Sequence, residues 1–258
     1  MQDGQASRTA RGVAAVRLHT ERERAPGGDP EADDRLTARV AGGAAGDGPM
    51  SRYLAIRTRF FDRVLLRALD AGVRQVVIAA AGYDGRALRY AREGVRWFEL
   101  DHPDTQRDKL AQLAALGIRT DHIHFVAADF TRDDVRGGLR AAGCDPSDRS
   151  LVLAEGIAVY LDAAVLERLL TDLRAVVGSG SRLAVSLSLQ TDDRDRLLRR
   201  RAFDDRVAAL GEPVRSRLTA EEAAALLEHA GWRIEAAASP AEQRARAAGL
   251  VIATATDR

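Results

Sequence analysis

The sequence predicts an α/β protein with a mostly parallel β-sheet, an antiparallel hairpin at one edge of that sheet, and a helical cap. From residue 74 onward, short runs rich in β-branched and apolar residues alternate with segments of helix length. This alternation is typical of a parallel sheet covered on both faces. The last two strand-like runs, 232–238 and 250–256, have no expected helix between them. They therefore predict a hairpin around residues 239–249.

Each expected element has its own local pattern. The expected strands are 74–81, 95–101, 123–129, 150–156, 181–189, 232–238 and 250–256. Apolar residues at helical spacing predict helices over 51–72, 162–177 and 219–230. Gly72 and Gly231 suit helix ends, Asp162 suits an N-cap, and Thr219 with Glu222 forms a capping box.

Two segments lie outside this alternation. Residues 1–50 are expected to form an N-terminal cap or lid, helical over 7–20 and elsewhere loop-like and partly flexible, because Gly, Pro and Asp dominate there. Residues 51–258 then form the main domain. A helical insertion at 191–212 is expected to roof a substrate pocket, with Leu197, Leu198, Phe203 and Val207 as its apolar side. Its arginines are interpreted as a solvated face rather than a nucleic-acid patch.

Composition narrows the class of protein. Lys plus Arg is 39 and Asp plus Glu is 38, which argues against a general nucleic-acid binder. Cys144 is the only cysteine, so no intrachain disulfide is expected and a reducing compartment fits. No run approaches the roughly 20 apolar residues of a membrane span, and the first 20 residues lack a signal-peptide pattern. We expect a cytoplasmic protein with no membrane, nucleic-acid or metal partner.

The stretch VVIAAAGYDGRALRY, residues 76–90, reads as a buried strand, a glycine turn and a helix. Gly82 permits a tight turn. Dinucleotides require G-x-G-x-x-G, but Ala80 stands at the first glycine and Asp84 would place a carboxylate beside the phosphates. A ligand without phosphate, such as S-adenosylmethionine (SAM), fits this turn better.

Acidic residues also end the next two strands. Asp101 lies 101 − 82 = 19 residues after Gly82. A carboxylate at this position can accept hydrogen bonds from both ribose hydroxyls. This spacing does not separate SAM from NAD. Asp129 and Phe130 end the third strand and could contact an adenine. The alternative is that Asp129 is a helix N-cap and Phe130 a core residue.

Five motifs in order resemble bacterial SAM-dependent O-methyltransferases related to leucine carboxyl methyltransferases. They are RTRFFD (57–62), AAGYDGRALR (80–89), FELDHP (98–103), AADF (127–130) and LAEGIAVYL (153–161). The resemblance implies a class I, Rossmann-like SAM-methyltransferase fold. The sequence departs from the family pattern at two positions, with Ala80 where glycine is usual and Gly85 where threonine is usual.

The resemblance also implies roles for individual residues. Arg59 would pair with the SAM carboxylate, and Gly82 and Asp84 would line the methionine moiety. Asp101 would hold the ribose, and Glu155 would face the SAM amino group or the reacting centre. The adenine would lie against Asp129 and Phe130. Structural alternatives stay open for Arg59 as a helix-surface residue, Glu155 as a helix cap and Tyr160 as core.

The predicted function is SAM-dependent methyl transfer to a small-molecule acceptor, as O-methylation of a carboxylate or hydroxyl in natural product biosynthesis. A carboxylate acceptor needs no base, whereas a hydroxyl would benefit from one, with His102, Glu155 and Tyr160 as candidates. Two alternatives stay open: a SAM-binding protein without methyl transfer, and an NAD-dependent oxidoreductase. Whether the chain forms a homodimer also stays open.

Overall fold

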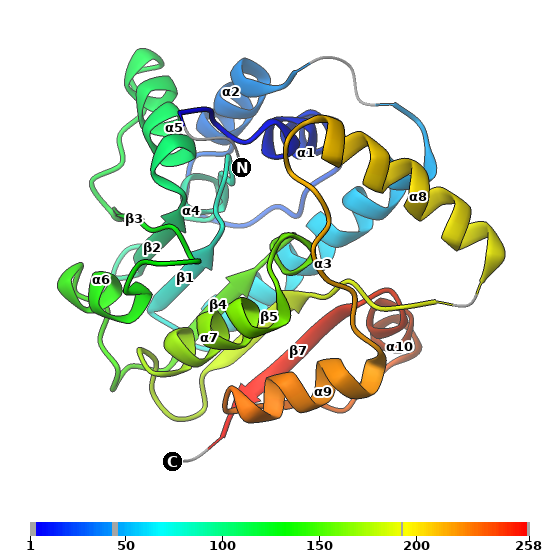
Figure 1. Ribbon diagram of the computed structural model, residues 1–258. Coiled ribbons are helices and arrows are strands. Elements are labelled where there is room, and N and C mark those ends of the chain that lie inside the picture. Colours follow the sequence, from blue (N-terminus) through cyan, green and yellow to red (C-terminus); the bar gives the residue numbers. More distant parts are fainter. Residues whose placement is uncertain (1–3, 43–45, 192, 257–258) are drawn as a thin grey trace.

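A single seven-stranded sheet forms the centre of the computed structural model, which describes residues 4–42, 46–191 and 193–256 (Figure 1). The strand order is β3-β2-β1-β4-β5-β7-β6. The strands are β1 (Gln75–Ala79), β2 (Arg96–Asp101), β3 (Ile123–Ala127), β4 (Ser150–Ala154), β5 (Arg182–Ser186), β6 (Trp232–Ile234) and β7 (Leu250–Ala255). Strands β1 to β5 are parallel, and β7 runs antiparallel to both β5 and β6. The predicted fold class is confirmed.

Both faces of the sheet are covered by helices. In β1, Val77 and Ala79 belong to one apolar core, while Val76 and Ile78 belong to the core on the other face. The first core is closed by α6 (Val135–Ala141), α7 (Ala163–Arg174) and α9 (Ala220–His229). The second is closed by α1 (Arg8–Leu18), α2 (Pro30–Val40), α3 (Pro49–Asp70), α4 (Arg86–Arg89) and α5 (Pro103–Ala115). A strand buried on both faces explains why β1 is continuously apolar.

The direction of strand order reverses at β1, which pairs with β2 on one side and β4 on the other. In open α/β sheets the ligand lies beyond the carboxyl ends of the strands at such a point. The loops after β1, β2 and β4 therefore define where a site is expected. The glycine turn follows β1, Asp101 is the last residue of β2, and Glu155 follows β4.

Two connecting segments predicted as loops contain helices. Helix α2 begins at Pro30 after the N-cap Asp29, whose side chain accepts a hydrogen bond from the Ala32 N–H. Proline at the first helical position and an aspartate cap favour a helix start, so the loop interpretation of this stretch was wrong. Helix α10 (Pro240–Ala247) lies within the predicted hairpin connection. The antiparallel pairing of β6 with β7 is nevertheless confirmed. Residues 43–45 of the predicted N-terminal loop lie outside the described residues.

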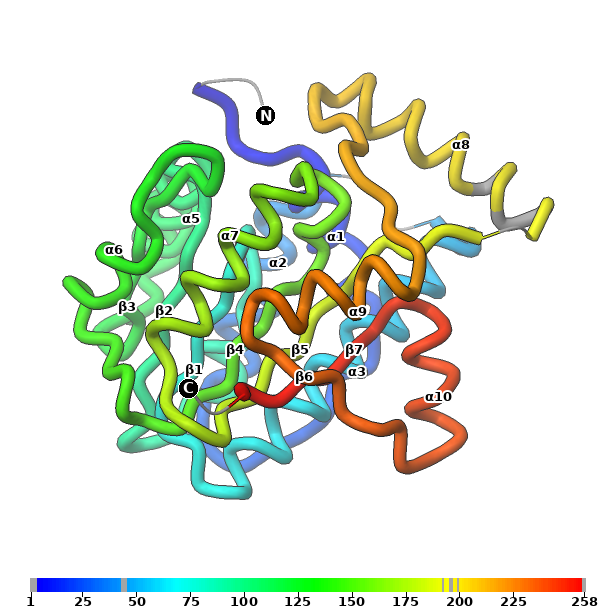
Figure 2. Tube along the Cα trace, turned by 60° about the horizontal axis from the view of Figure 1, so that its bottom comes forward, coloured from blue at the N-terminus to red at the C-terminus, as the bar shows by residue number. Residues whose placement is uncertain are grey.

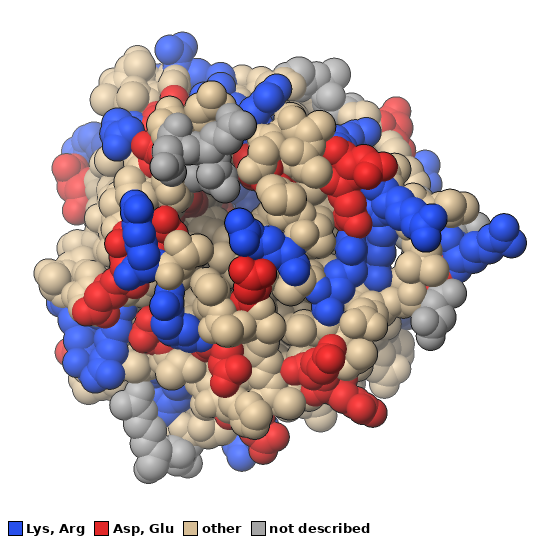
Figure 3. Space-filling model, viewed as in Figure 1, with Lys and Arg blue, Asp and Glu red and all other residues tan. Residues whose placement is uncertain are grey.

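The insertion contains helix α8 (Arg194–Ala209), which stands apart from the sheet on the side of α1 (Figure 2). Val207 is 2% exposed, but Leu197 and Leu198 are 41% and 59% exposed. The predicted apolar side is therefore wrong in its first turns, because α8 packs only through its later residues. Basic and acidic side chains lie side by side over α8, and charges of both signs are interspersed over the rest of this face (Figure 3).

Candidate active site

The turn after β1 joins two of the predicted residues. The Gly82 N–H donates to Oδ2 of Asp101 at the end of β2, and the His102 N–H donates to the other oxygen at 2.6 Å. Gly82 has a φ of +51°, as the sequence predicted for a tight turn. Ala80 also has a positive φ, +55°, which an alanine adopts at a cost. The position where glycine was expected therefore keeps a glycine-like backbone.

Gly85, the second departure from the family pattern, makes room for a carboxylate from the N-terminal cap. A Cβ at residue 85 would lie 1.8 Å from Oδ1 of Asp33 in α2. The other oxygen of Asp33 accepts from Arg89 at 2.5 Å and from Arg22 at 3.3 Å. The start of α4 is therefore packed against Asp33 of α2.

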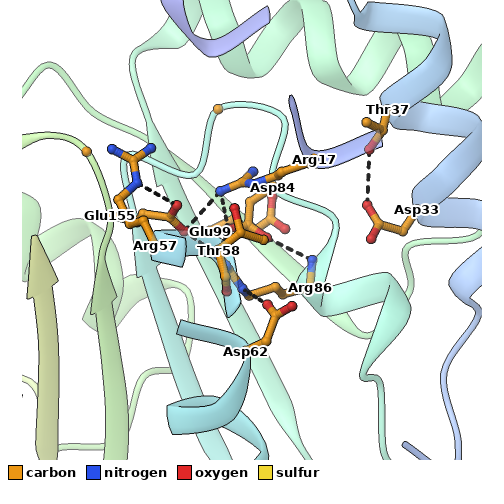
Figure 4. A network of polar contacts seen from close by, with 12 residues as sticks. Arg17, Asp33, Thr37, Arg57, Thr58, Asp62, Asp84, Arg86, Glu99 and Glu155 are labelled. Carbon is orange, nitrogen blue, oxygen red and sulfur yellow. Dashed lines mark hydrogen bonds and ion pairs between the residues drawn. The ribbon is translucent and has the colours of Figure 1, made fainter. Parts of the chain in front are cut away.

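A buried arginine lies at the centre of the site (Figure 4). Arg86 is fully buried, and its Nη1 donates to Asp84 at 2.5 Å and to Glu155 at 2.6 Å. Its Nε donates to Asp62 of α3 at 2.7 Å. Asp84 also accepts from the N–H of Arg86, the first residue of α4, at 2.8 Å, while Gly85 is the N-cap of that helix. Both residues predicted beside the methionine moiety and reacting centre, Asp84 and Glu155, thus contact one guanidinium.

Two further arginines reach the same carboxylates. Nη2 of Arg17, from α1, lies 3.3 Å from Asp84 and 3.0 Å from Glu155. Nε of Arg57, from α3, donates to Glu155 at 2.9 Å. Burial would raise the pKa of Glu155, but Arg86, Arg17 and Arg57 hold that pKa well below its ordinary value. Burial likewise opposes ionisation of Asp84, but Arg86 and, to a smaller extent, Arg17 lower its pKa below the ordinary value.

The structure brings Arg57 to Glu155. The resemblance gave Arg59 a different role, toward the SAM carboxylate, and that role stays a prediction. Arg57 is 8% exposed, and Arg59 is more exposed. A helix turns about 100° per residue, so residues two apart point in different directions. Arg57 lies four residues before Phe61 and in phase with the buried Leu65. Helical periodicity could therefore have identified Arg57, whereas the contribution of Arg17 had no comparable local signal.

Phe130 takes the core position of the structural alternative, whereas Asp129 bonds within a turn and the N-cap of the next helix is Asp134. Asp129 accepts from the Thr131 N–H at 2.9 Å and from its hydroxyl at 2.7 Å. Phe130 is 7% exposed and belongs to the core beneath α7. The Ala128 N–H donates to the Asp101 carbonyl at 2.8 Å, which brings the ends of β2 and β3 together. Their role toward adenine stays a prediction.

The other two candidate bases lie at the rim of the site. His102 is the N-cap of α5, and its Nδ1 accepts from the Asp104 N–H at 3.3 Å. Tyr160 ends the short 3₁₀ helix η1 (Ala158–Tyr160), and burial raises its pKa. Within the described part of the chain, a cavity of about 140 Å³ lies against α10 and one of about 520 Å³ lies beside residues 18–24, both away from these residues.

The chain belongs to the leucine carboxyl methyltransferase family, whose model matches residues 5–174. This confirms the resemblance that the five motifs indicated. A Parafrankia protein (strain EAN1pec) is 50% identical over 53% of this chain and 44% of its own length. A Mycobacterium protein (strain KMS) is 41% identical over 58% of this chain and 50% of its own. Both carry the name "Putative S-adenosyl-L-methionine-dependent methyltransferase". The chain thus spans about half the length of these curated relatives.

A solved structure shows the same fold. Magnesium protoporphyrin IX methyltransferase from Synechocystis, with bound SAH, aligns over 83% of this chain and 90% of its own, at 13% identity and a TM-score of 0.51. At this identity the likeness supports the fold alone. Within the described residues, none of the helices is long and apolar enough to cross a membrane.

Proposed function

We propose that this protein is a SAM-dependent methyltransferase that methylates a small-molecule acceptor. The observation that carries the proposal is the family match together with the contact between Gly82 and Asp101. That contact joins the glycine turn to a carboxylate at the strand end where a ribose diol is expected. When bound, SAM would supply an electrophilic methyl group on a sulfonium, and the chain would have to hold and orient it.

The residues present fit the carboxylate of SAM. Three arginines, Arg17, Arg57 and Arg86, converge on Asp84 and Glu155, and Arg86 also pairs with Asp62. Nε of Arg17 is buried without a hydrogen-bond partner among the described residues. A Cβ on Gly156 would lie only 3.1 and 3.2 Å from the two Nη atoms of Arg57. Glycine at 156 therefore leaves space beside a fork of donors that suits a carboxylate.

The site favours a carboxylate as the methyl acceptor. Glu155 is paired with arginines and its lowered pKa makes it a weak base. The raised pKa of Tyr160 keeps its proton on the phenol. Nδ1 of His102 already accepts a backbone N–H, which places the proton of a neutral ring on Nε2. A carboxylate needs no deprotonation by these groups, and the chain would act by aligning it and excluding water.

The electrostatic argument against a dinucleotide changes with the structure. Asp84 is neutralised by Arg86 and Arg17 instead of facing an open pocket. Its charge would therefore repel a pyrophosphate less than the sequence suggested. Family membership is what favours SAM over NAD. O-methylation in natural product biosynthesis, the cytoplasmic location and a homodimer remain predictions.

The N-terminal cap and the insertion at 191–212 would act as one lid. The carboxylate of Glu212 accepts from the Ser7 hydroxyl at 3.0 Å and from the Arg8 N–H at 2.8 Å at the start of α1. Because α1 also carries Arg17 into the site, opening the cap would expose Asp84 and Glu155. Hydrogen exchange over 7–50 and 191–212 should slow together when SAM binds. Equal exchange with and without SAM would contradict a lid.

A turnover assay tests the proposed function. The protein would be incubated with SAM and a panel of carboxylic acids and phenols, and methyl transfer followed by mass spectrometry. We expect methyl esters from carboxylic acids, with rates that vary little between pH 7 and 9. SAM binding without turnover on any acceptor would favour the non-catalytic alternative, and binding of NAD but not SAM would favour the oxidoreductase.

A further inference from the structure

Lys109 is the only lysine in a chain whose Lys and Arg total 39, and it is 2% exposed. Its Nζ donates to the backbone carbonyl of Asp84 at 2.6 Å and to Oε2 of Glu99 at 2.5 Å. The single nitrogen of an ammonium can donate to two acceptors that both point at it, whereas the donors of a guanidinium are spread over a wide planar fork. The position therefore suits lysine in a chain that otherwise uses arginine.

The contact belongs to a set that ties the whole glycine turn to β2 and α5. The Ala81 N–H donates to the Leu100 carbonyl at 2.9 Å, and the Gly82 N–H donates to Asp101. Tyr83 donates through its hydroxyl to Asp108, and Asp84 accepts from Lys109. Four consecutive turn residues thus each contact β2 or α5. Of these contacts, the one from Lys109 has a cation as its donor.

Lys109 also acts on two carboxyl groups of β2, Glu99 and Asp101. Glu99 and Asp101 are two residues apart on β2, so their side chains lie on one face of the strand. Burial raises the pKa of Glu99 to about 7 against the opposing effect of Lys109. Lys109 likewise opposes the burial that raises the pKa of Asp101. The ammonium thus favours the ionised form of the residue expected to hold the ribose.

We propose that Lys109 is a positioning residue for the cofactor, which holds the turn at residues 81–85, and with it the contact of Gly82 with Asp101, in the geometry that binds SAM. The proposal rests on the SAM site proposed above. Lys109 need not touch SAM, because it acts through the Asp84 carbonyl and Asp101.

Calorimetric titration with SAM, together with thermal unfolding, tests this role. Lys109→Met should weaken SAM binding at least about tenfold, the scale of one hydrogen bond to a charged group. Glu99→Gln keeps the Lys109 contact with the turn and should bind SAM within about threefold of wild type. Arg107→Met is the matched control, because Arg107 is an exposed cation on the same helix. It should bind SAM like wild type.

A double variant separates positioning from stability. In Glu99→Met/Lys109→Met both charges are replaced by apolar groups of similar size, which commonly restores stability. We expect the melting temperature to return close to that of wild type while SAM binding stays about tenfold weaker. Recovery of SAM affinity together with the melting temperature would overturn the proposal, as would equal losses in Glu99→Gln and Lys109→Met. Failure of the proposed function would differ, since wild type itself would then bind no SAM.

Discussion

Two regions of the sheet are stabilised in different ways: the carboxyl ends of β1 and β4, here called the ionic end, and the β5-β7-β6 edge, here called the other end. At the carboxyl ends of β1 and β4, buried arginines and carboxylates fill the space, with Arg86 fully buried between Asp62, Asp84 and Glu155. At the β5-β7-β6 edge, apolar side chains of α9 and β6 pack together, and Trp232 donates to the Leu170 carbonyl at 2.9 Å. A fold that needs only stability can use the second arrangement. The costly buried charges of the first mark the region that we assign to binding.

The largest expected effect comes from removing the central arginine. Arg86→Met leaves Asp62, Asp84 and Glu155 buried with fewer cations, and should lower the free energy of unfolding by about 3–5 kcal/mol at pH 7. The matched change at the other end is Leu227→Ala, which should cost about 2–5 kcal/mol by leaving a cavity. Urea denaturation measures both. A loss below about 1 kcal/mol for Arg86→Met would contradict the difference between the two ends.

The next effect concerns ligand binding. Asp101→Ala should weaken SAM binding by about 1.5–3 kcal/mol, because a charged hydrogen-bond acceptor is removed. Glu235→Ala is the control at the opposite edge, where Glu235 pairs with Arg182, and it should leave SAM binding unchanged. Calorimetry on folded variants measures the difference. Equal affinities for the Asp101 and Glu235 variants would remove the ribose assignment.

Acid should affect the ionic end selectively. The pKa of Glu155 is lower in the folded chain than its ordinary value of 4.5, so the unfolded chain binds the proton first as the pH falls. The ionised Glu155 therefore stabilises the folded chain at pH values above 4.5, and this contribution is lost as the pH falls toward its folded-state pKa. Each such proton changes stability by about 1.4 kcal/mol per pH unit. Glu155→Gln should therefore flatten the decline below pH 4.5 that wild type shows.

An exposed glutamate provides the control for this pH dependence. Glu228 is exposed on α9, and Glu228→Gln should keep the wild-type slope. Urea titrations at several pH values from 7 down to about 3 compare the three proteins. If the Glu155 and Glu228 variants lose stability with identical slopes, Glu155 is not the group that titrates.

The smallest expected effect is the relief of backbone strain. Ala80 has a φ of +55°, so Ala80→Gly should raise the free energy of unfolding by about 0.5–1 kcal/mol. SAM binding should tighten if the methyl crowds the ligand and stay unchanged if the turn has relaxed around it. At the other end, Gly249→Ala should destabilise, since a Cβ there would lie 2.2 Å from the Leu187 carbonyl oxygen. A less stable Ala80→Gly variant would show that the alanine is not strained.

These two ends also differ in how much the sequence could predict. The capping box of Thr219 and Glu222 could be predicted because the two residues are only three apart, and the structure confirms it. The contact of Gly82 with Asp101 follows a known spacing of strand, helix and strand. Arg17 lies 138 residues from Glu155 along the chain, and no local pattern connects them. Long-range ion pairs depend on how the cap packs, so periodicity and capping rules do not reveal them.

The central claim is that the ionic end of the sheet binds SAM through Arg57 and its neighbours. Calorimetric titration of SAH and of NAD into wild type, Arg57→Met and Arg59→Met tests it most directly. The account predicts that wild type and Arg59→Met bind SAH alike, that Arg57→Met binds it at least about tenfold more weakly, and that NAD gives no binding. Unchanged SAH binding in Arg57→Met, or tighter binding of NAD than of SAH by wild type, would contradict the account.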